Sequence, residues 1–231
     1  MSLLEIKNVK KNFGGVEVLK DISLKVDKGE VLGIIGPSGS GKSTMLNMLA
    51  GLEKPTKGEV IVAGEHLEKM NENQLVKFRR EHVGFIFQSF NLLGTMNAIE
   101  NVALPLTFRG VDKKIREAKA VEMLKLVGLP KHMKHRPNEM SGGQQQRVGV
   151  ARALVLDPEI IFADEPTGNL DSKTSAEVLG LMRKVVTEKN QTMVMVTHDN
   201  HLAGFADRIF HIIDGKIVKI EDRSEYKEDE Q

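Results

Sequence analysis

The chain has 231 residues, enough for one large domain or two small ones with a substantial hydrophobic core. Its 33 basic and 32 acidic residues leave a formal net charge of +1, which predicts no general attraction to nucleic acid or anionic membranes. It has no cysteine, no apolar signal-peptide core at the N-terminus and no apolar run of about 18 residues, so disulfides are excluded and we expect a cytoplasmic protein.

The first ninety residues alternate between predicted strands and one clear helix. Apolar and polar residues alternate over residues 3–9 and 16–26, which predicts two strands that end at the turn of residues 27–30. Residues 31–36 are wholly apolar and bounded by glycine, as in a strand buried on both faces. Residues 42–52 predict a helix ending near Gly51, and residues 57–65 and 82–88 predict further strands.

The pattern then changes and later returns. Residues 91–139 predict a mainly helical insertion, with apolar residues at helical spacing between Ile115 and Val127. A strand over residues 160–164, a helix near Ser175–Thr187, a strand over 192–198 and a hairpin turning at Asp214-Gly215 follow. We therefore predict an α/β fold with a mostly parallel central sheet, an antiparallel β flank and a helical arm. One domain would span residues 1–220, with a helical subdomain inserted at 90–145, before a frayed, charged tail at 221–231.

A phosphate-binding loop is predicted between the strand at 31–36 and the helix that follows it. The sequence GPSGSGKST fits the pattern G-x-x-x-x-G-K-[ST] in the required strand–loop–helix setting. Glycines allow a tight loop whose N–H groups point inward, and the helix N-terminus adds positive potential for phosphate. The loop consists of Gly36, Pro37, Ser38, Gly39, Ser40, Gly41, Lys42, Ser43 and Thr44. Lys42 would reach the β- and γ-phosphates and Ser43 would bind Mg²⁺; the alternative is a turn that only caps the helix.

Two carboxylates directly follow the apolar strand at residues 160–163. A lone carboxylate is costly to bury, so Asp164 and Glu165 predict either a bound cation or the cap of a helix that starts at once. Beside a phosphate-binding loop, Asp164 would hold Mg²⁺ and its water shell. Glu165, one residue later, would point elsewhere and orient or deprotonate the water that attacks the γ-phosphate.

Three further motifs give the chain a family resemblance. In chain order the motifs are FIFQ at residues 85–88, MSGGQQQR at 140–147 and VTHD at 196–199. The first two precede the strand with the two carboxylates, and the third follows that strand. Together with the phosphate-binding loop, this ordered set resembles the ATP-binding cassette (ABC) ATPases over nearly the whole chain. The resemblance implies a P-loop NTPase (RecA-like) core and ATP hydrolysis with Mg²⁺. The first motif residue is usually Leu and is Met140 here, a nearly volume-conserving change.

The resemblance also assigns roles to individual residues. Phe13 would stack on adenine, although an ordinary core phenylalanine is the alternative; Gln88 would touch the metal and the attacking water, and His198 the γ-phosphate. Ser141, Gly142, Gly143 and Gln144 match the signature loop, which contacts the γ-phosphate on the other subunit of a head-to-tail homodimer. Asp171 matches the loop that links the two sites.

A longer stretch narrows the resemblance to one group within the family. Residues 87–106 and the sequence ADEPTGNLDS resemble the lipoprotein-releasing and macrolide-efflux ATPases, with Gly94 where many members have Pro. This implies an integral-membrane permease partner, a peripheral position on the inner face of the membrane, and export. Phe90, Leu92, Leu93 and Met96 are candidate permease contacts, or else they pack the helical arm. The alternatives are an ABC ATPase in a non-transport process such as cell-division signalling, or a nucleic-acid-associated one, against which the balanced charge argues.

Overall fold

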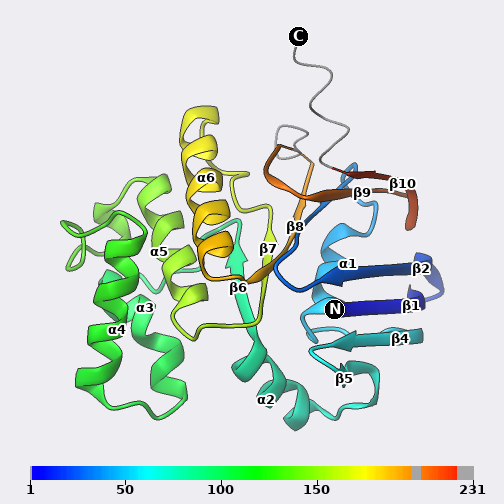
Figure 1. The fold of residues 1–231 in the computed structure, drawn as a ribbon, viewed down its shortest axis with the longest axis horizontal. Coiled ribbons are helices and arrows are strands. Elements are labelled where there is room, and N and C mark those ends of the chain that lie inside the picture. Colours follow the sequence, from blue (N-terminus) through cyan, green and yellow to red (C-terminus); the bar gives the residue numbers. More distant parts are fainter. Residues whose placement is uncertain (1, 199–203, 223–231) are drawn as a thin grey trace.

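The larger of two sheets forms the centre of the molecule. The computed structural model describes residues 2–198 and 204–222 (Figure 1). Six strands lie in the order β10-β9-β3-β8-β7-β6. They are β3 (Val31–Ile35), β6 (Val83–Phe87), β7 (Ile160–Asp164), β8 (Thr192–Thr197), β9 (Arg208–Ile213) and β10 (Lys216–Asp222). All run parallel except β10, which returns antiparallel to β9. The mostly parallel central sheet is therefore confirmed.

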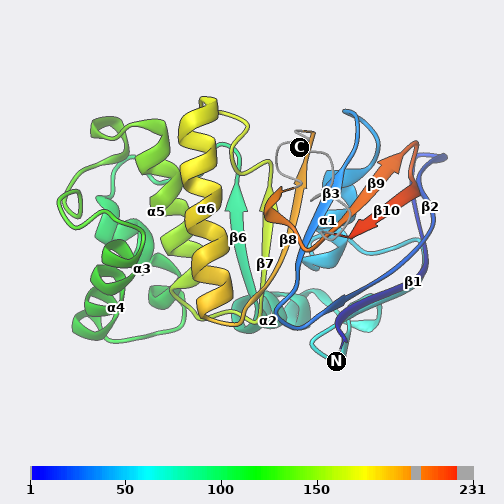
Figure 2. The same ribbon diagram turned by 45° about the horizontal axis from the view of Figure 1, so that its top comes forward.

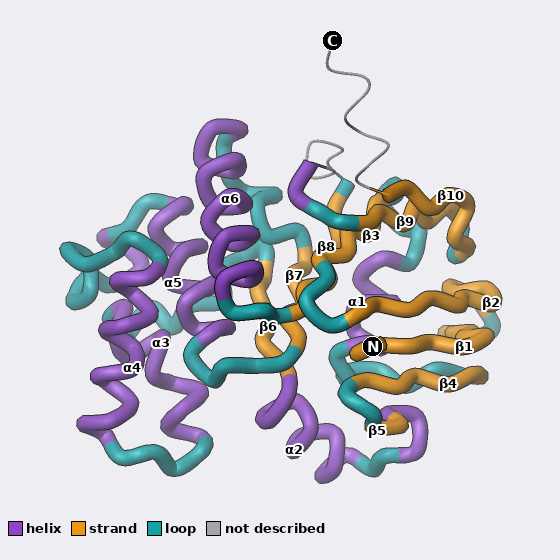
Figure 3. Tube along the Cα trace, viewed as in Figure 1, coloured by secondary structure: helices purple, strands orange, loops and turns teal. Residues whose placement is uncertain are grey.

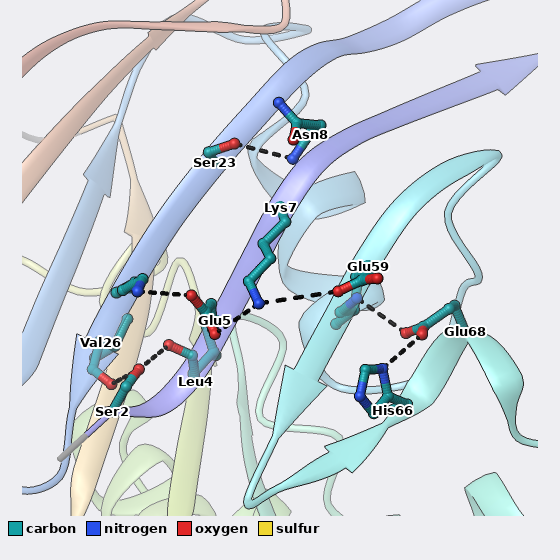
Figure 4. A network of polar contacts seen from close by, with 12 residues as sticks. Ser2, Leu4, Glu5, Lys7, Asn8, Ser23, Val26, Glu59, His66 and Glu68 are labelled. Carbon is teal, nitrogen blue, oxygen red and sulfur yellow. Dashed lines mark hydrogen bonds and ion pairs between the residues drawn. The ribbon is translucent and has the colours of Figure 1, made fainter.

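The second sheet is the antiparallel flank that the alternating patterns predict. Its order is β2-β1-β4-β5, with β1 (Ser2–Phe13), β2 (Val16–Asp27), β4 (Lys57–Val62) and β5 (Glu65–His66). Figure 4 shows polar contacts on this sheet: Lys7 on β1 lies 3.3 Å from Glu5 of the same strand and 3.9 Å from Glu59 on the neighbouring strand β4. Asn8 N donates to Ser23 Oγ on β2 at 2.9 Å. Such cross-strand pairs help to fix the register.

The helices lie in two groups. The α-helices are α1 (Lys42–Leu49), α2 (Glu72–His82), α3 (Ala98–Phe108), α4 (Lys113–Leu126), α5 (Gly142–Leu154) and α6 (Ser172–Glu188), with short 3₁₀ turns η1 (Leu67–Lys69) and η2 (Pro137–Glu139). Figures 1 and 3 place α3, α4 and α5 together in a helical arm, at the opposite end of the molecule from β1, β2 and β4. Within the described residues, no helix combines the length and apolarity that a bilayer crossing requires.

The central sheet separates two hydrophobic cores. In β7, Ile160 and Phe162 pack into the core that contains α1, whereas Ile161 and Ala163 pack into the core that contains α5 and α6. Residues alternate in this way because successive side chains of a strand point to opposite faces. This double burial explains why the strand reads as an unbroken apolar run.

Two features differ from the expectations or go beyond them. Helix α2 was not predicted, although Asn71 and Gln74 form a capping box at its start. The tail was expected to begin at residue 221, but β10 continues to Asp222 because Glu221 and Asp222 pair with Ile209 and Arg208. Residues 223–231, the rest of the predicted frayed tail, lie outside the described residues.

Candidate functional site

The predicted phosphate-binding loop joins β3 to α1, and the start of α1 is unusual. Gly41 occupies the N-cap position with φ of 101°, and α1 has no side-chain hydrogen bond at its cap. A Cβ atom on Gly41 would lie 2.7 Å from Leu19 Cδ2, so the loop requires glycine there. The other α-helices of the described residues are capped by Asn71, Asn97, Asp112, Ser141 and Asp171. The first N–H groups of α1 therefore have no side-chain acceptor at the cap, as an anion-binding helix start requires.

Lys42 lies inside this loop rather than on the surface. Its side chain bends back so that Nζ donates to the carbonyl oxygens of Gly36 at 2.8 Å and Pro37 at 2.9 Å. A cavity of about 160 Å³ lies beside it, lined by Val18, Gly39, Gly41, Lys42, Ser43 and Thr44. The loop therefore places Lys42 and the start of α1 beside one open cavity.

Asp164 and Ser43 meet at the carboxyl end of β7. Ser43 Oγ donates to Asp164 Oδ1 at 3.3 Å. Burial raises the pKa of the Asp164 carboxyl, as does the charge of Glu165, whereas the Ser43 hydrogen bond and the charge of Lys42 lower it. Helix α6 begins at Ser172 and is capped by Asp171, so the helix-cap alternative for Asp164 is wrong.

This pair fits Mg²⁺. A hydroxyl and a carboxylate are the hard oxygen donors that Mg²⁺ prefers, and a nearby cation would offset the environment that disfavours charge on Asp164. The amide of Gln88, the third predicted ligand, lies at the end of β6 next to β7. Its Nε2 atom lies 2.7 Å from the position that a Cβ atom on Gly168 would occupy, so the Gln88 side chain is directed toward the loop after Glu165.

Glu165 has a different partner from Asp164, as predicted for two adjacent carboxylates with separate roles. Its Oε2 atom lies 2.6 Å from Nδ1 of His198, which follows β8. The backbone of Glu165 is in the left-handed region, with φ of 46°, and its N–H donates to Val196 O at 2.9 Å. Glu165 and His198 border a cavity of about 410 Å³, with Ser172 and Ser175 of α6 on its wall. The structure therefore brings these two predicted residues into direct contact.

Phe13 lies at the surface, so the alternative of an ordinary core residue is wrong. Its exposed fraction is 45%. It pairs across the β1–β2 hairpin with Val16, and directly paired residues share a face of the sheet. Val18 lies at an irregularity of the β1–β2 pairing, between the pairs Asn12–Glu17 and Lys11–Leu19, and it lines the cavity beside the phosphate-binding loop. Phe13 and Val18 thus belong to the same hairpin, and that hairpin contributes Val18 to the wall of this cavity.

The signature residues are not brought to the phosphate-binding loop of the same chain. Ser141 is the N-cap of α5: its Oγ accepts from Gln144 N at 3.4 Å, and its own N–H donates to Gln144 Oε1 at 3.0 Å. Both Figures 1 and 2 place α5 and α1 on opposite sides of β6, β7 and β8. The cap predicted from Ser141 alone is thus present, but residues 141–144 could complete the site at Lys42 only on another copy of the chain.

Asp171 is engaged at the start of α6. Its Oδ1 accepts from Thr174 N at 3.0 Å and its Oδ2 from Thr174 Oγ1 at 2.6 Å. These hydrogen bonds hold the pKa of the Asp171 carboxyl below its usual value. The residue therefore has a local capping role in the single chain.

The four candidate permease contacts separate into packed and open residues. Leu92 packs against the core of the helical arm and Phe90 is half-buried, whereas Leu93 is 43% exposed. Met96 lines a groove of about 460 Å³ between α3 and α4. Glu100, Ala103 and Leu104 of α3 and Arg116 of α4 line the same groove.

Two residues that sequence reasoning missed hold the segment after Gln88. Arg152 on α5 donates to Phe90 O at 2.8 Å and Asn91 O at 2.5 Å, and burial lowers the pKa of its guanidinium. Asn101 on α3 is fully buried, and its Oδ1 accepts a hydrogen bond from Leu93 N at 2.8 Å. Its Nδ2 donates to the carbonyl oxygens of Leu93, Met96 and Asn97 at 3.0–3.1 Å. An asparagine among apolar helix residues was the available signal for Asn101, whereas Arg152 read as an ordinary helix residue.

Comparisons with known proteins agree with this geometry. The sequence profile of the ABC transporter family matches residues 19–168. The ABC transporter ATP-binding protein MJ1508 of Methanocaldococcus jannaschii is 49% identical over 222 residues, which are 94% of this chain and 99% of that protein. The macrolide export ATP-binding/permease protein MacB of Shewanella sp. strain ANA-3 is 46% identical over 223 residues. That match covers 95% of this chain but 34% of MacB.

A solved structure supports the same assignment. The ATP-binding cassette MJ0796, also from Methanocaldococcus jannaschii, was solved as a dimer in a post-hydrolysis state bound to ADP and Pi. It superposes on this chain with a TM-score of 0.86 at 43% identity, covering 95% of this chain and 98% of that one. The central sheet, the flank and the helical arm are thus those of an ATP-binding cassette with a P-loop NTPase core. The chain belongs to the ABC transporter family, as an ATP-hydrolysing cassette of the MacB and MJ0796 type.

Proposed function

We propose that this ATPase works as an ATP-sandwiched, head-to-tail homodimer that drives a membrane permease. The observation that carries the proposal is the separation of Ser141–Gln144 from the phosphate-binding loop of the same chain, across the central sheet. A second copy related by two-fold symmetry would place each signature loop over the other copy's loop at residues 36–44. The dimeric MJ0796 structure supports this arrangement by similarity.

Each half of the site would then have its own task. Residues 36–44 bind the phosphates through backbone N–H groups and the Lys42 ammonium, and Phe13 stacks on adenine. Ser43, Asp164 and Gln88 hold Mg²⁺, which when bound offsets the charge of the phosphates. Ser141, Gly142, Gly143 and Gln144 of one chain contact the γ-phosphate held by the other, and Asp171 links the two sites.

Glu165 and His198 would act on the reaction itself. The Glu165 carboxylate orients the attacking water and accepts its proton as the water oxygen bonds to the γ-phosphorus and the bond to the β–γ bridging oxygen breaks. His198, 2.6 Å from that carboxylate, holds Glu165 in place and can contact the γ-phosphate. Both groups need to be present, but only Glu165 takes the proton.

The test is a Glu165→Gln variant in saturating Mg-ATP. We expect it to bind nucleotide, to lose at least about 100-fold of the hydrolysis rate because the general base is gone, and to accumulate as a dimer by light scattering. The matched control is Glu159→Gln, because Glu159 forms a similar pair with His82 Nδ1, at 2.7 Å, next to the opposite end of β7. Monomer alone in the Glu165→Gln sample would contradict the ATP-sandwiched dimer.

The permease would dock on the helical arm, at the groove between α3 and α4 and the nearby Leu93. The subunit would then lie at the inner face of the membrane, held by its permease. Export is the favoured direction, because the related MacB is a macrolide export protein. This choice rests on family resemblance and on no feature of the catalytic site.

A pull-down from native membranes tests the permease contact. Tagged Glu165→Gln protein with Mg-ATP should retain a permease with few spans and a large extracytoplasmic domain, and a further Leu93→Glu change should abolish that retention while ATP still binds. Val218→Glu is the control, since Val218 is 56% exposed on β10, far from the arm. A permease with many spans and a solute-binding protein would indicate import instead, and a cell-wall regulator would indicate the cell-division alternative.

A further inference from the structure

A buried ammonium group lies against the ring of Phe13. The exposed fraction of the Lys11 side chain is 11%, and its Nζ atom is 4.6 Å from the centroid of the Phe13 ring. A cation over an aromatic face at this distance is attracted by the quadrupole of the ring. Since the ammonium covers one face, the exposed 45% of Phe13 belongs mainly to the opposite face and the edge. One face of the ring is therefore covered by Lys11, and the opposite face is open to solvent.

Lys11 is fixed on its other side by the segment that follows α1. Its Nζ donates to Glu53 Oε2 at 2.7 Å and to Lys54 O at 2.8 Å. That segment is tied to the last turn of α1, because the N–H groups of Leu52 and Glu53 donate to Asn47 O at 2.8 and 3.2 Å. Lys11 thus connects the Phe13 ring to the helix that starts at the phosphate-binding loop.

Backbone contacts reinforce this connection on both sides of Lys11. Thr56 N donates to Lys10 O at 2.8 Å, and Asn12 N donates to Thr56 Oγ1 at 2.9 Å. The end of β1 therefore cannot shift relative to residues 53–56 without breaking several hydrogen bonds. Beyond Phe13 the hairpin turns at Gly14 and Gly15, where a Cβ atom would meet no heavy atom within 4 Å. The hairpin turn is therefore not packed against other parts of the molecule, and the Lys11 ammonium restrains the Phe13 ring next to it.

We propose that Lys11 is a positioning residue for the nucleotide base. It holds the Phe13 ring at a fixed place relative to α1, so that a base stacked on the open face and phosphates bound at residues 36–44 are held at a matching separation. The ammonium also draws electron density toward the covered face, which favours a neutral base over a cationic group on the open one. The inference rests on the proposed role of Phe13 in stacking on adenine.

The test compares the binding of ADP with the binding of inorganic pyrophosphate, which has the same phosphate groups without the base. We expect Lys11→Met to weaken ADP binding about three- to tenfold and to leave pyrophosphate binding unchanged. Lys10→Met removes the same charge from the neighbouring residue, whose side chain is 43% exposed and whose amine lies 3.9 Å from Glu17, and should change neither. Lys11→Gln, which keeps a donor for Lys54 O but no charge, is the second variant should Lys11→Met unfold.

A double-mutant cycle separates this inference from the role of Phe13. Phe13→Ala alone should weaken ADP binding about tenfold or more, and adding Lys11→Met to it should cost nothing further. If Phe13→Ala leaves ADP binding intact, the stacking role itself is wrong. If Phe13→Ala weakens ADP binding but Lys11→Met or Lys11→Gln does not, or if either weakens pyrophosphate equally, Lys11 is a structural cation and the inference is overturned.

Discussion

At the scale of single residues, Asp164 and Glu165 show how neighbours acquire separate chemistry. Asp164 is the last residue of β7 and turns to the side of the sheet that Phe162 and α1 occupy, where it meets Ser43 of the phosphate-binding loop. Glu165 lies beyond the strand in a left-handed backbone conformation and turns toward His198. Burial raises the pKa of the Asp164 carboxyl. Its environment therefore opposes the ionised form until a cation is near.

This environment makes the stability of the nucleotide-free protein depend on pH. A carboxyl whose pKa is raised on folding binds its proton more tightly in the folded state, so its contribution is present below the unfolded-state pKa and is lost as pH rises through the folded-state pKa. Asp164→Asn removes this loss. We expect calorimetry without nucleotide to give Asp164→Asn a higher Tm than the wild type at about pH 7, with the gain shrinking toward about pH 4.

Asp171→Asn provides a control of opposite sign. The pKa of Asp171 is lowered by its bonds to Thr174, so its contribution is present above the unfolded-state pKa and is lost as pH falls through the folded-state pKa. Its Asn variant should therefore lower the Tm near neutral pH. Equal shifts in the same direction for both variants would contradict the sign of the Asp164 effect.

The residues that could be predicted from the sequence belong to motifs in which each residue type is required at a fixed position. Lys42, Ser43, Asp164 and Glu165 could be placed because a phosphate-binding loop dictates what must surround it. Lys11 could not, because its contacts with Glu53 and Lys54 join segments some forty residues apart that meet only through strand pairing. A buried lysine in an alternating strand looks like any exposed one until the fold is known.

At the scale of elements, α5 and the segment after β6 behave as one piece. Phe90 and Asn91 both have positive φ, of 59° and 48°, and both present their carbonyl oxygens to Arg152. The helix that begins with the signature residues therefore holds the chain just after Gln88. A displacement of α5 would move the Gln88 segment with it.

Arg152→Met tests this connection. We expect a loss of about 2–4 kcal/mol in the free energy of unfolding, because two hydrogen bonds from a charged donor disappear. Amide hydrogen exchange over residues 88–93 should also become faster. Arg147→Met on the same helix removes only a surface pair with Glu177, 3.1 Å long, and should cost less than about 1 kcal/mol. Equal denaturation midpoints for the two variants would show that Arg152 does not hold the segment.

Element prediction worked where a pattern was long and failed where it was short or polar. The strands β3, β7 and β8 could be predicted from unbroken apolar runs, since two cores cover them. Helix α2 was missed because only Leu75 and Phe78 are buried on it and the rest of its sequence is polar. Its capping box at Asn71 and Gln74 was the signal that could have revealed it.

At the scale of the whole molecule, the phosphate-binding loop and the predicted signature loop lie on opposite sides of the central sheet. The sequence motifs indicate both loops, but they do not show that the loops are far apart. The order of the six strands places β6, β7 and β8 between α5 and α1. That order depends on the packing of both cores and could not be obtained from local patterns. If the proposed dimer shares its sites between chains, mixing two inactive variants should restore activity.

Two inactive variants should restore each other. Lys42→Ala removes the ammonium of the phosphate-binding loop, and Ser141→Arg blocks the signature loop, so neither homodimer contains an intact site. In a mixed dimer, the loop of the Ser141→Arg chain faces the signature of the Lys42→Ala chain, and one intact site results. We expect ATPase activity to reappear on mixing, and not when the Lys42→Ala chain also carries Ser141→Arg. Absence of recovery at every ratio would contradict a site shared between chains.

The bare start of α1 has a consequence for the lifetime of the subunit. Among the α-helices of the described residues, five have a side-chain cap and α1 has none, so a phosphate group bound at α1 would supply the acceptor that is missing there. A ligand at 100 times its Kd adds about 2.7 kcal/mol to the free energy of unfolding. If the nucleotide binds at α1 as proposed, each round of turnover that releases ADP before new ATP arrives would leave the subunit without this added stability. A cell that runs short of nucleotide would then lose these subunits to unfolding and proteolysis sooner.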